Sequence, residues 1–343
     1  MSQSNPPVRV MIAGVGGASL GTELCKSLER AKRYEAFGCD ISPSAYGLHD
    51  PGFRRTYLID REDYVDNVID SCLDAKASWL IPGGEQPMVL LGEAADKLAQ
   101  AGIRLVANDP GVIELFSNKE ETFKKLADNG FNIPRTVALN SADDIESIGL
   151  PCIVKPSTGS GGSASVFFAT SSDEALIYAE FIRRNGSQAI AQEYVDAEEG
   201  EFTIGVLSLS NNHVAGSIAL RRELGAKLSV AYRGRGGVVS SGYSQGYIDD
   251  FPELCQQAES IAKAVGSRGP MNIQARVRNG QILPFEINPR FSASTYLRAL
   301  AGFNEVDILL RYLCNGEVVE KHDIRSGWYL RSLTEQFVPN EAM

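Results

Sequence analysis

A short segment late in the chain combines residue types that could bind a metal ion and a phosphate. In FEINPR, residues 285–290, apolar residues alternate with Glu286 and Asn288, and Arg290 follows. Residues two apart on a strand share a face, so a carboxylate would stand beside an amide oxygen. Oxygen ligands suit Mg²⁺, and a guanidinium suits phosphate. The alternative is an edge strand with a solvated polar face, a setting that Pro284 would tolerate.

The preceding segment, residues 270–279, enlarges this polar face if the two segments form a hairpin. A two-residue turn would place Gln274 opposite Phe285, on the apolar face. A three-residue loop, residues 278–280 with Gly280 left-handed, would place Asn272 opposite Glu286 and keep Gln274 on the polar face. We therefore predict the three-residue loop and a patch of oxygen ligands from Asn272, Gln274, Glu286 and Asn288.

Upstream, a lysine precedes a loop that could surround phosphates. Lys155 stands at a predicted strand end, and the Gly/Ser-rich loop that follows holds Thr158, Gly159, Ser160, Gly161, Gly162 and Ser163. Glycines let backbone amides approach an anion closely. No G-K-[ST] follows, so this is not a Walker loop. A predicted strand follows instead, as in hairpin lids that close over ATP; the alternative is a surface hairpin.

A further candidate site is the end of another predicted strand, where backbone groups could meet an adenine edge. The four residues there are Gln192, Glu193, Tyr194 and Val195.

Hydrophobic periodicity divides the chain into three predicted units. Residues 1–110 alternate strands and helices as in a doubly wound α/β sheet, beginning with strand, Gly-rich loop, helix and strand. Residues 111–195 form a small α+β unit, and residues 196–343 are mostly antiparallel, with a hairpin turning at Asn211-Asn212. The segment RGRGGVVSSGYSQG is expected to be a loop.

The composition limits the function classes. The chain has 343 residues and a net charge of −10, which disfavours a nucleic-acid surface. Six scattered cysteines without CxxC pairs fit a reducing compartment. Neither a signal peptide nor a membrane span is recognisable, so a cytoplasmic protein without membrane partners is expected.

Taken in order, these motifs resemble the ATP-grasp superfamily, and most of all a single module of the carbamoyl-phosphate synthetase large chain. The resemblance rests on SNKEETF around Lys119, IVKPSTGSGGS, QEYV, EGEFTIGVL around Glu201, GPMNIQ and FEINPR. It implies an ATP-grasp fold behind an N-terminal Rossmann-like (pre-ATP-grasp) domain. Residues 111–195 would be the small subdomain with the Gly-rich lid, and residues 196–343 the large subdomain with the magnesium site.

The resemblance also implies roles for these residues. Lys119 and Lys155 would contact ATP phosphates, and residues 158–163 would form the lid. Glu193 and Val195 would bracket the adenine amino group, and Glu201 would hold the ribose. Gln274, Glu286 and Asn288 would bind one or two Mg²⁺ ions, with Mn²⁺ as an alternative. Arg290 would stabilise the transferred phosphoryl group.

The implied chemistry is ADP-forming ligation of a small-molecule carboxylate to an amine through an acyl-phosphate. Such phosphoryl transfer depends on positioning and charge neutralisation more than on a general base. The chain has one module and no further synthetase domains, which favours a stand-alone ligase. The resemblance permits a homodimer.

The substrate residues are less defined. Arg222, Arg233, Arg235 and Arg298 lie where such enzymes meet the acceptor or the acyl-phosphate, and Glu85 could contact an amine. For each arginine the alternative is a solvated surface residue.

Two rival functions remain at this stage. Gly14, Gly17 and Gly21 with Asp40 resemble a dinucleotide fingerprint, which would indicate an NAD-dependent dehydrogenase. The third interpretation is a non-catalytic ATP-binding sensor.

Overall fold

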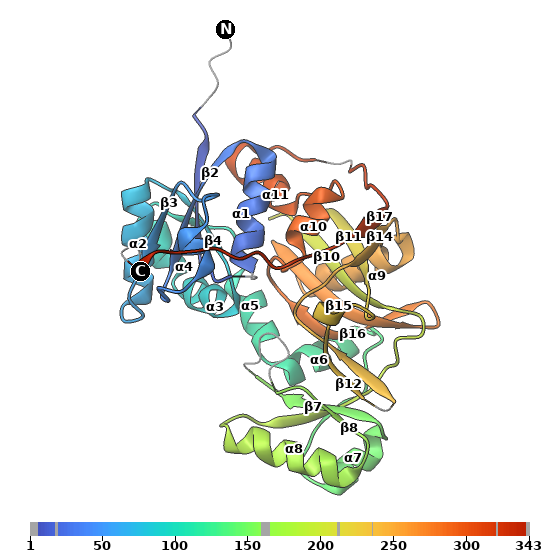
Figure 1. Ribbon diagram of the computed structural model, residues 1–343. Helices are drawn as coiled ribbons and strands as arrows, with labels where there is room; N and C mark the ends of the chain where they lie inside the picture. Colours follow the sequence, from blue (N-terminus) through green and yellow to red (C-terminus); the bar gives the residue numbers. More distant parts are fainter. Residues whose placement is uncertain are drawn as a thin grey trace.

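The computed structural model describes residues 6–17, 20–158, 165–210, 213–234, 236–319 and 322–340. Three main sheets follow one another along the chain, and a two-stranded hairpin accompanies the third (Figure 1). Within the described residues, no helix is long and apolar enough to cross a membrane.

The first sheet is parallel, with strand order β3-β2-β1-β4-β5. Alternate residues of its central strand enter two different cores: Val10 and Ile12 face α1, whereas Met11 and Ala13 face α2. A strand buried on both faces explains the unbroken apolar run VRVMIA. The elements are β1 (Val8–Ala13), α1 (Leu20–Ala31), β2 (Tyr34–Asp40), η1 (Tyr46–His49), β3 (Arg55–Leu58), α2 (Tyr64–Ala75), β4 (Trp79–Pro82), α3 (Glu85–Glu93), α4 (Ala95–Gln100), β5 (Arg104–Leu105) and α5 (Pro110–Ser117).

The second sheet is small and antiparallel, with order β6-β9-β7-β8. Apolar residues of α7 and α8 cover one face of it. In Figure 1 this unit lies at the bottom, apart from the first sheet. Its elements are β6 (Thr136–Ala138), α7 (Ala142–Ile148), β7 (Cys152–Pro156), β8 (Phe167–Ala169), α8 (Ser172–Arg184) and β9 (Ala189–Glu193). Helix α6 (Lys119–Asp128) precedes them in the chain, and its buried apolar residues belong to the core of the third sheet.

The third sheet has six antiparallel strands in the order β16-β15-β10-β11-β14-β17. Apolar residues of α9 pack on one face, and those of α10 and α11 on the other. The elements are β10 (Glu201–Ser208), β11 (Val214–Arg222), η3 (Lys227–Ser229), β12 (Val230–Gly234), β13 (Gly237–Ser240), β14 (Gly246–Asp249), α9 (Pro252–Ala264), β15 (Pro270–Arg278), β16 (Gln281–Asn288), α10 (Thr295–Leu300), α11 (Glu305–Asn315) and β17 (Gly327–Tyr329).

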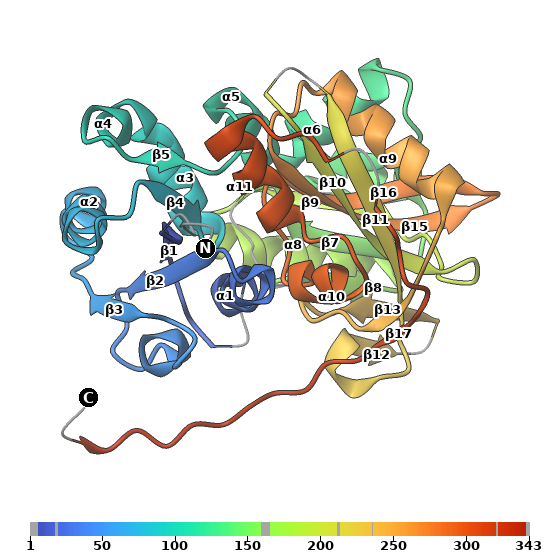
Figure 2. The ribbon, with the colours of Figure 1, turned by 90° about the horizontal axis from the view of Figure 1, so that it is seen from above.

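The first and third sheets share a core through helix α1. Leu24 and Leu28 of α1 belong to the same buried cluster as Phe291, Leu297 and Val306. Figure 2 shows α1 beside α10, in agreement with their contacts. Because this core is continuous, the carboxyl edge of the first sheet is held in place relative to the polar face of β15 and β16.

The predicted three-residue turn between β15 and β16 is wrong. Arg278 pairs with Gln281, so Asn279 and Gly280 form a two-residue turn, and both have positive φ as a type I′ turn requires. A β-bulge between Gln274 and Ala275 then shifts the register, so that Gln274 lies opposite Glu286. The bulge, and not a longer turn, therefore keeps the polar residues of the two strands on one face.

One further prediction is corrected by the structure, and another falls on residues that the structure does not describe. The segment expected to be a Gly/Ser-rich loop contains the end of β12 and all of its antiparallel partner β13. The expected turn at Asn211-Asn212 lies outside the described residues.

A single buried side chain fixes the ends of β15 and β16. The amide nitrogen of Asn108 donates to the carbonyl oxygens of Pro270 (2.7 Å) and Pro289 (3.3 Å). Its oxygen accepts from the Arg268 amide at 2.8 Å and from the Ser267 hydroxyl at 3.0 Å. Pro289 stands between Asn288 and Arg290, so Asn108 supports the polar face from the first unit.

We predict that Asn108→Ala lowers the free energy of unfolding by about 3 kcal/mol, because it leaves buried donors and acceptors unsatisfied. Urea unfolding would measure the change. The exposed Asn129→Ala is the control and should shift stability by less than about 0.5 kcal/mol. Equal effects of the two substitutions would contradict the assigned role of Asn108.

Candidate active site

A cleft between the second and third sheets collects most of the residues singled out from the sequence. It is walled by residues of β7 and β9 on one side and of β13, β15 and β16 on the other. The expected residues in its lining are Lys119, Lys155, Gln192, Glu193, Tyr194, Val195, Glu201, Gln274 and Glu286.

Lys155 is the most buried cation of the cleft, with 5% of its surface exposed. Its Nζ donates to Gln192 Oε1 and to the Phe285 carbonyl oxygen, each at 2.8 Å, and so links β7, β9 and β16. Burial, reinforced by the charge of Lys119, lowers the pKa of Lys155 to about 7. The cleft therefore holds a lysine whose protonated form a nearby anion would stabilise, with the proton taken up from solvent.

Lys119 begins α6 and reaches both this cleft and a smaller adjoining cavity. The smaller cavity is also lined by Glu85, Glu286 and Asn288. Burial lowers the pKa of Lys119, and the charges of Glu286 and Glu85 act in the opposite direction. The structure thus brings Glu85, from the start of α3 in the first unit, to the polar face of β16.

The polar face of β16 carries its own hydrogen bonds. Asn288 Nδ2 donates to Glu286 Oε1 at 3.0 Å, and Arg290 Nη2 lies 3.4 Å from Asn288 Oδ1. Desolvation lowers the pKa of Arg290, and its buried Nε has no partner among the described residues. The unused donor of the Arg290 guanidinium is suited to an anion. The oxygens of Glu286, Asn288 and Gln274 are suited to a metal ion.

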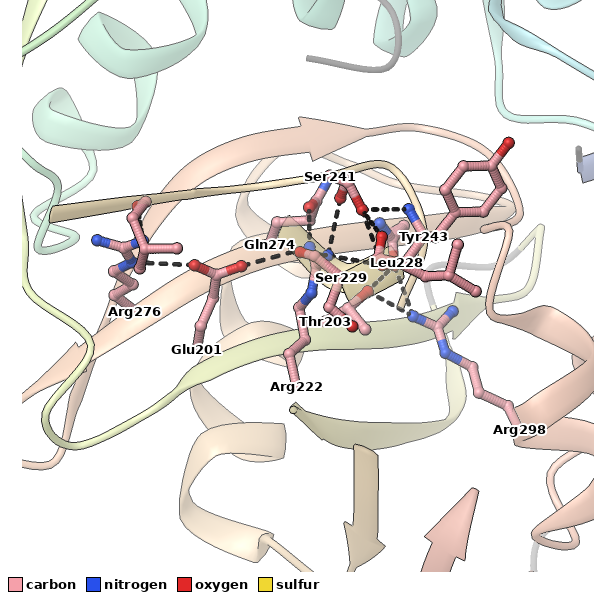
Figure 3. A network of polar contacts seen from close by, with 12 residues as sticks. Glu201, Thr203, Arg222, Leu228, Ser229, Ser241, Tyr243, Gln274, Arg276 and Arg298 are labelled. Atoms are coloured by element: carbon pink, nitrogen blue, oxygen red, sulfur yellow. Dashed lines mark hydrogen bonds and ion pairs between the residues drawn. The ribbon is translucent and has the colours of Figure 1, made fainter. Parts of the chain in front are cut away.

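Glu201 is a buried carboxylate between two arginines. One of its oxygens lies 3.0 Å from Arg276 Nε, and the other lies 3.3 Å from Arg222 Nη1 (Figure 3). Only 1% of Glu201 is exposed, yet the residue lines the cleft, and its Oε1 has no hydrogen-bond donor among the described residues.

Sequence reasoning missed Arg276. Its guanidinium also donates to the carbonyl oxygens of Val195 and Val238, and it lies 4.8 Å from the centre of the Tyr194 ring. It therefore joins the strand-end segment 192–195 to β13. The alternation along β15 places Arg276 on the face of Gln274, which is a signal that could have found it.

The apolar lining was also missed. It includes Ile153 of β7, Val238 and Val239 of β13, and Phe285 of β16. These residues resemble any core position in the sequence, so only the tertiary structure assigns them to the cleft.

The segment 192–195 presents backbone rather than free side chains. Glu193 is ion-paired with Arg278 (2.8 Å) and Arg135 (3.3 Å), and the Tyr194 hydroxyl accepts from the Val238 amide at 3.0 Å. Gln192 accepts from Lys155 and donates to Thr136 at 2.9 Å.

Three of the proposed arginines do not offer a free guanidinium to the cleft. Arg222 donates to Gln274 Oε1 (3.2 Å) and to the carbonyl oxygens of Ser229, Ser241 and Tyr243. Exposed Arg233 donates to the Leu224 carbonyl, and fully buried Arg298 pairs with Glu305. These contacts do not fit the expected arginine fork for a substrate.

The expected lid is described only at its first residue. Exposed Thr158 forms an isolated bridge with Asn118. Gly159, Ser160, Gly161, Gly162, Ser163 and Arg235 lie outside the described residues.

The Gly-rich loop after β1 does not present its acid to a ligand. Asp40 accepts backbone amides at both oxygens, from Val15 at 2.7 Å and from Ser42 at 3.0 Å. A side chain at Gly17 would meet Tyr46, whose Cβ lies 2.7 Å from the position of an added Cβ. This loop is thus engaged with the protein itself, which removes the support for a dehydrogenase.

Comparison with known families identifies the class of this fold and site. The ATP-grasp domain family matches residues 116–294, more than half of the chain. The chain therefore belongs to the ATP-grasp family, as its motifs predict.

The carbamoyl phosphate synthase large chains that this sequence matches are much longer than this chain. The carbamoyl phosphate synthase large chain of Methanothrix thermoacetophila is 25% identical over 291 residues, which cover 82% of this chain and 26% of that protein. Across such relatives, the aligned part spans between 19% and 30% of their length.

Solved structures confirm the fold. The biotin carboxylase domain of 2-oxoglutarate carboxylase from Hydrogenobacter thermophilus, in complex with MgADP, ADP and bicarbonate, has a TM-score of 0.69 at 15% identity. The similarity covers 94% of this chain and 73% of that one. L-amino acid ligase from Bacillus licheniformis has a TM-score of 0.64 at 16% identity, covering 91% and 75%.

We predict that binding of MgATP at pH 8 takes up protons. Lys155, with its pKa near 7, is mostly neutral there, and a phosphate beside it would raise that pKa and draw in a proton. Calorimetry in buffers of different ionisation enthalpy would measure the uptake. It should shrink at pH 6 and disappear in Lys155→Met; an unchanged uptake in that variant would contradict the assignment.

Proposed function

We propose that this protein is an ADP-forming ligase that activates a small-molecule carboxylate with MgATP and joins it to an amine. The observation that carries the proposal is the convergence of Lys119, Lys155 and Arg290 on the polar face of Glu286 and Asn288. Burial lowers the pKa values of Lys119 and Lys155 in the cleft and of Arg290 beside Asn288, and three such cations near one another suit a highly charged anion.

Two buried atoms without a hydrogen-bond partner in the described part of the chain fit the proposed nucleotide, although one of them, Glu201 Oε1, lies 3.3 Å from Arg222 Nη1 in an ion pair. Glu201 Oε1 retains a lone pair that suits a ribose hydroxyl, and Arg290 Nε retains a donor that suits the transferred phosphoryl group. The apolar lining and the backbone of segment 192–195 suit a purine ring.

Gln274, Glu286 and Asn288 would hold magnesium. This set has one carboxylate, so the phosphates would complete the shell, as is usual for magnesium with nucleotides. When bound, the ion neutralises phosphate charge during transfer. Manganese would fit the same oxygen ligands.

The first step forms an acyl-phosphate. An oxygen of the substrate carboxylate attacks the γ-phosphorus, the bond to ADP breaks, and its electrons leave on ADP. Lys119, Lys155 and Arg290 hold the phosphates in line and balance the developing charge, so no general base is needed.

The second step forms the C–N bond. A neutral amine attacks the acyl carbon, phosphate leaves with the electrons of the C–O bond, and the nitrogen loses a proton. Glu85 lies in the same small cavity as Lys119 and Asn288, and it is the group that we propose holds the amine. In this scheme residues 111–195 and 196–343 bind the nucleotide, and residues 1–110 supply Glu85.

The test is release of ADP and phosphate with MgATP across a panel of carboxylates, each with and without amines. Release that requires one carboxylate–amine pair, with a condensed product by mass, would establish the ligase. MgATP binding without turnover on any pair would favour the sensor interpretation instead.

We predict that Glu286→Gln lowers ADP release by at least about 100-fold, because it removes the only carboxylate of the proposed magnesium set. Its thermal unfolding midpoint should change little, since Glu286 faces the cleft rather than a core. Exposed Glu253→Gln is the matched control and should keep wild-type turnover. Wild-type rates in Glu286→Gln would refute the metal assignment.

A further inference from the structure

Arg298 on helix α10 contacts side chains of the polar face, although none of its surface is exposed. Its Nη2 lies 2.5 Å from Asn272 Oδ1 and 3.2 Å from Thr203 Oγ1. Asn272 lies on β15 directly opposite Asn288 and two residues before Gln274, on the same face.

These contacts settle which way the Asn272 carboxamide points. An arginine can only donate hydrogen bonds, so the atom that faces Arg298 must be the amide oxygen. The Thr203 hydroxyl donates to the same oxygen at 2.8 Å. Both acceptor positions of that oxygen are therefore filled, one of them by a charged donor.

The fold is built to hold Arg298 in this place. Gly205 pairs with Asn272 across the sheet, and a Cβ at Gly205 would lie 2.4 Å from Arg298 Nη1. On the other side, fully buried Glu305 accepts from Arg298 Nη1 at 3.2 Å and also from the Thr295 hydroxyl. A glycine of β10 thus leaves room for the guanidinium, and a buried counter-ion holds it beside Asn272.

Asn272 consequently differs from its neighbour Gln274. Gln274 Oε1 has one protein donor, Arg222 Nη1 at 3.2 Å, and keeps a lone pair for a metal ion. The Asn272 oxygen keeps none, so the predicted membership of Asn272 in the oxygen-ligand patch is not supported. The group that Asn272 can still offer is its NH₂, which has no acceptor among the described residues.

We propose that Asn272 is a hydrogen-bond donor to the γ-phosphoryl group, and that Arg298 with Glu305 is the positioning pair that fixes its orientation. The inference rests on the proposed function, because it takes the polar face of β15 and β16 as the phosphoryl site. Donors aimed at a transferring phosphoryl group stabilise it without reorganisation during the reaction.

The test compares calorimetric affinities for MgATP and MgADP at saturating magnesium, a readout that needs no acceptor substrate. In Asn272→Asp, the donor becomes an anionic acceptor, and we expect MgATP affinity to fall by about 10- to 100-fold. MgADP affinity should stay within about threefold. The double variant Arg298→Met/Glu305→Gln, which removes the buried pair without leaving a charge, should weaken MgATP selectively by about 10-fold.

A magnesium titration in the presence of MgADP separates the two roles of Asn272. A metal ligand would bind magnesium more tightly as Asp, whereas a phosphoryl donor would not. Tighter magnesium binding, or unchanged MgATP affinity in Asn272→Asp, would overturn the donor role. Unchanged MgATP affinity in the double variant would overturn the positioning role.

One control variant and one replacement variant keep the outcomes distinct. Arg311→Met/Glu317→Gln removes a more exposed ion pair between α11 and the segment that follows it, and should leave both affinities unchanged. Arg298→Lys replaces the double variant if thermal unfolding shows that the latter does not fold, and is expected to weaken MgATP in the same selective way. Failure of the wild-type protein to bind MgATP would instead contradict the proposed function.

Discussion

The carboxylate of Glu201 is the charge on which the geometry of the cleft depends. It compensates two buried guanidiniums, Arg222 and Arg276, neither of which could otherwise remain in the interior. The two arginines also donate to the backbone carbonyls of residues 195, 229, 238, 241 and 243, and Arg222 donates to the Gln274 side chain. Through one carboxylate, the third sheet thus fixes the strand end at Val195 and the hairpin over the cleft. Breaking such a pair costs about 3–5 kcal/mol, because a buried charge is left alone.

The cations that face the cleft are treated in the opposite way. Lys155 and Arg290 have partial partners, and burial lowers the pKa of each. Burial disfavours the charged form of each of these cations, and under the proposed function bound phosphates would offset that cost. Arginines that are paired with a buried carboxylate support the cleft, whereas cations without such a partner are the ones suited to contact a ligand.

The sequence predicts the polar face of β15 and β16 well, and the reason is local. Side-chain alternation on a strand depends only on period two, so Glu286 and Asn288 could be assigned to one face. Gln274 was assigned to the same face through a three-residue loop that the structure does not contain. The predicted turn was wrong because the pairing of β15 with β16 is interrupted by a bulge, which no pattern of alternation contains. Pro284, which cannot donate a hydrogen bond to the strand ladder, stands beside the bulge and was the available signal.

The roles of the arginines were harder to predict from the sequence. Whether Arg222 or Arg298 faces a substrate or a buried glutamate depends on Glu201 and Glu305, which only the tertiary fold brings near.

The two amides of β15 show how such buried partners define chemistry. An amide can accept or donate, and the sequence does not say which atom it presents. Arg222 and Arg298 each direct a guanidinium at an amide oxygen, of Gln274 and Asn272 respectively. Of the residues described, only Arg222 donates to the Gln274 oxygen, at 3.2 Å, so that oxygen can still bind a metal ion. The Asn272 oxygen accepts from both Arg298 and Thr203, so Asn272 can offer a ligand only its NH₂ group. On this argument, β16 supplies the carboxylate and β15 supplies an oriented N–H, and residues that never touch the ligand determine how a phosphoryl group is held.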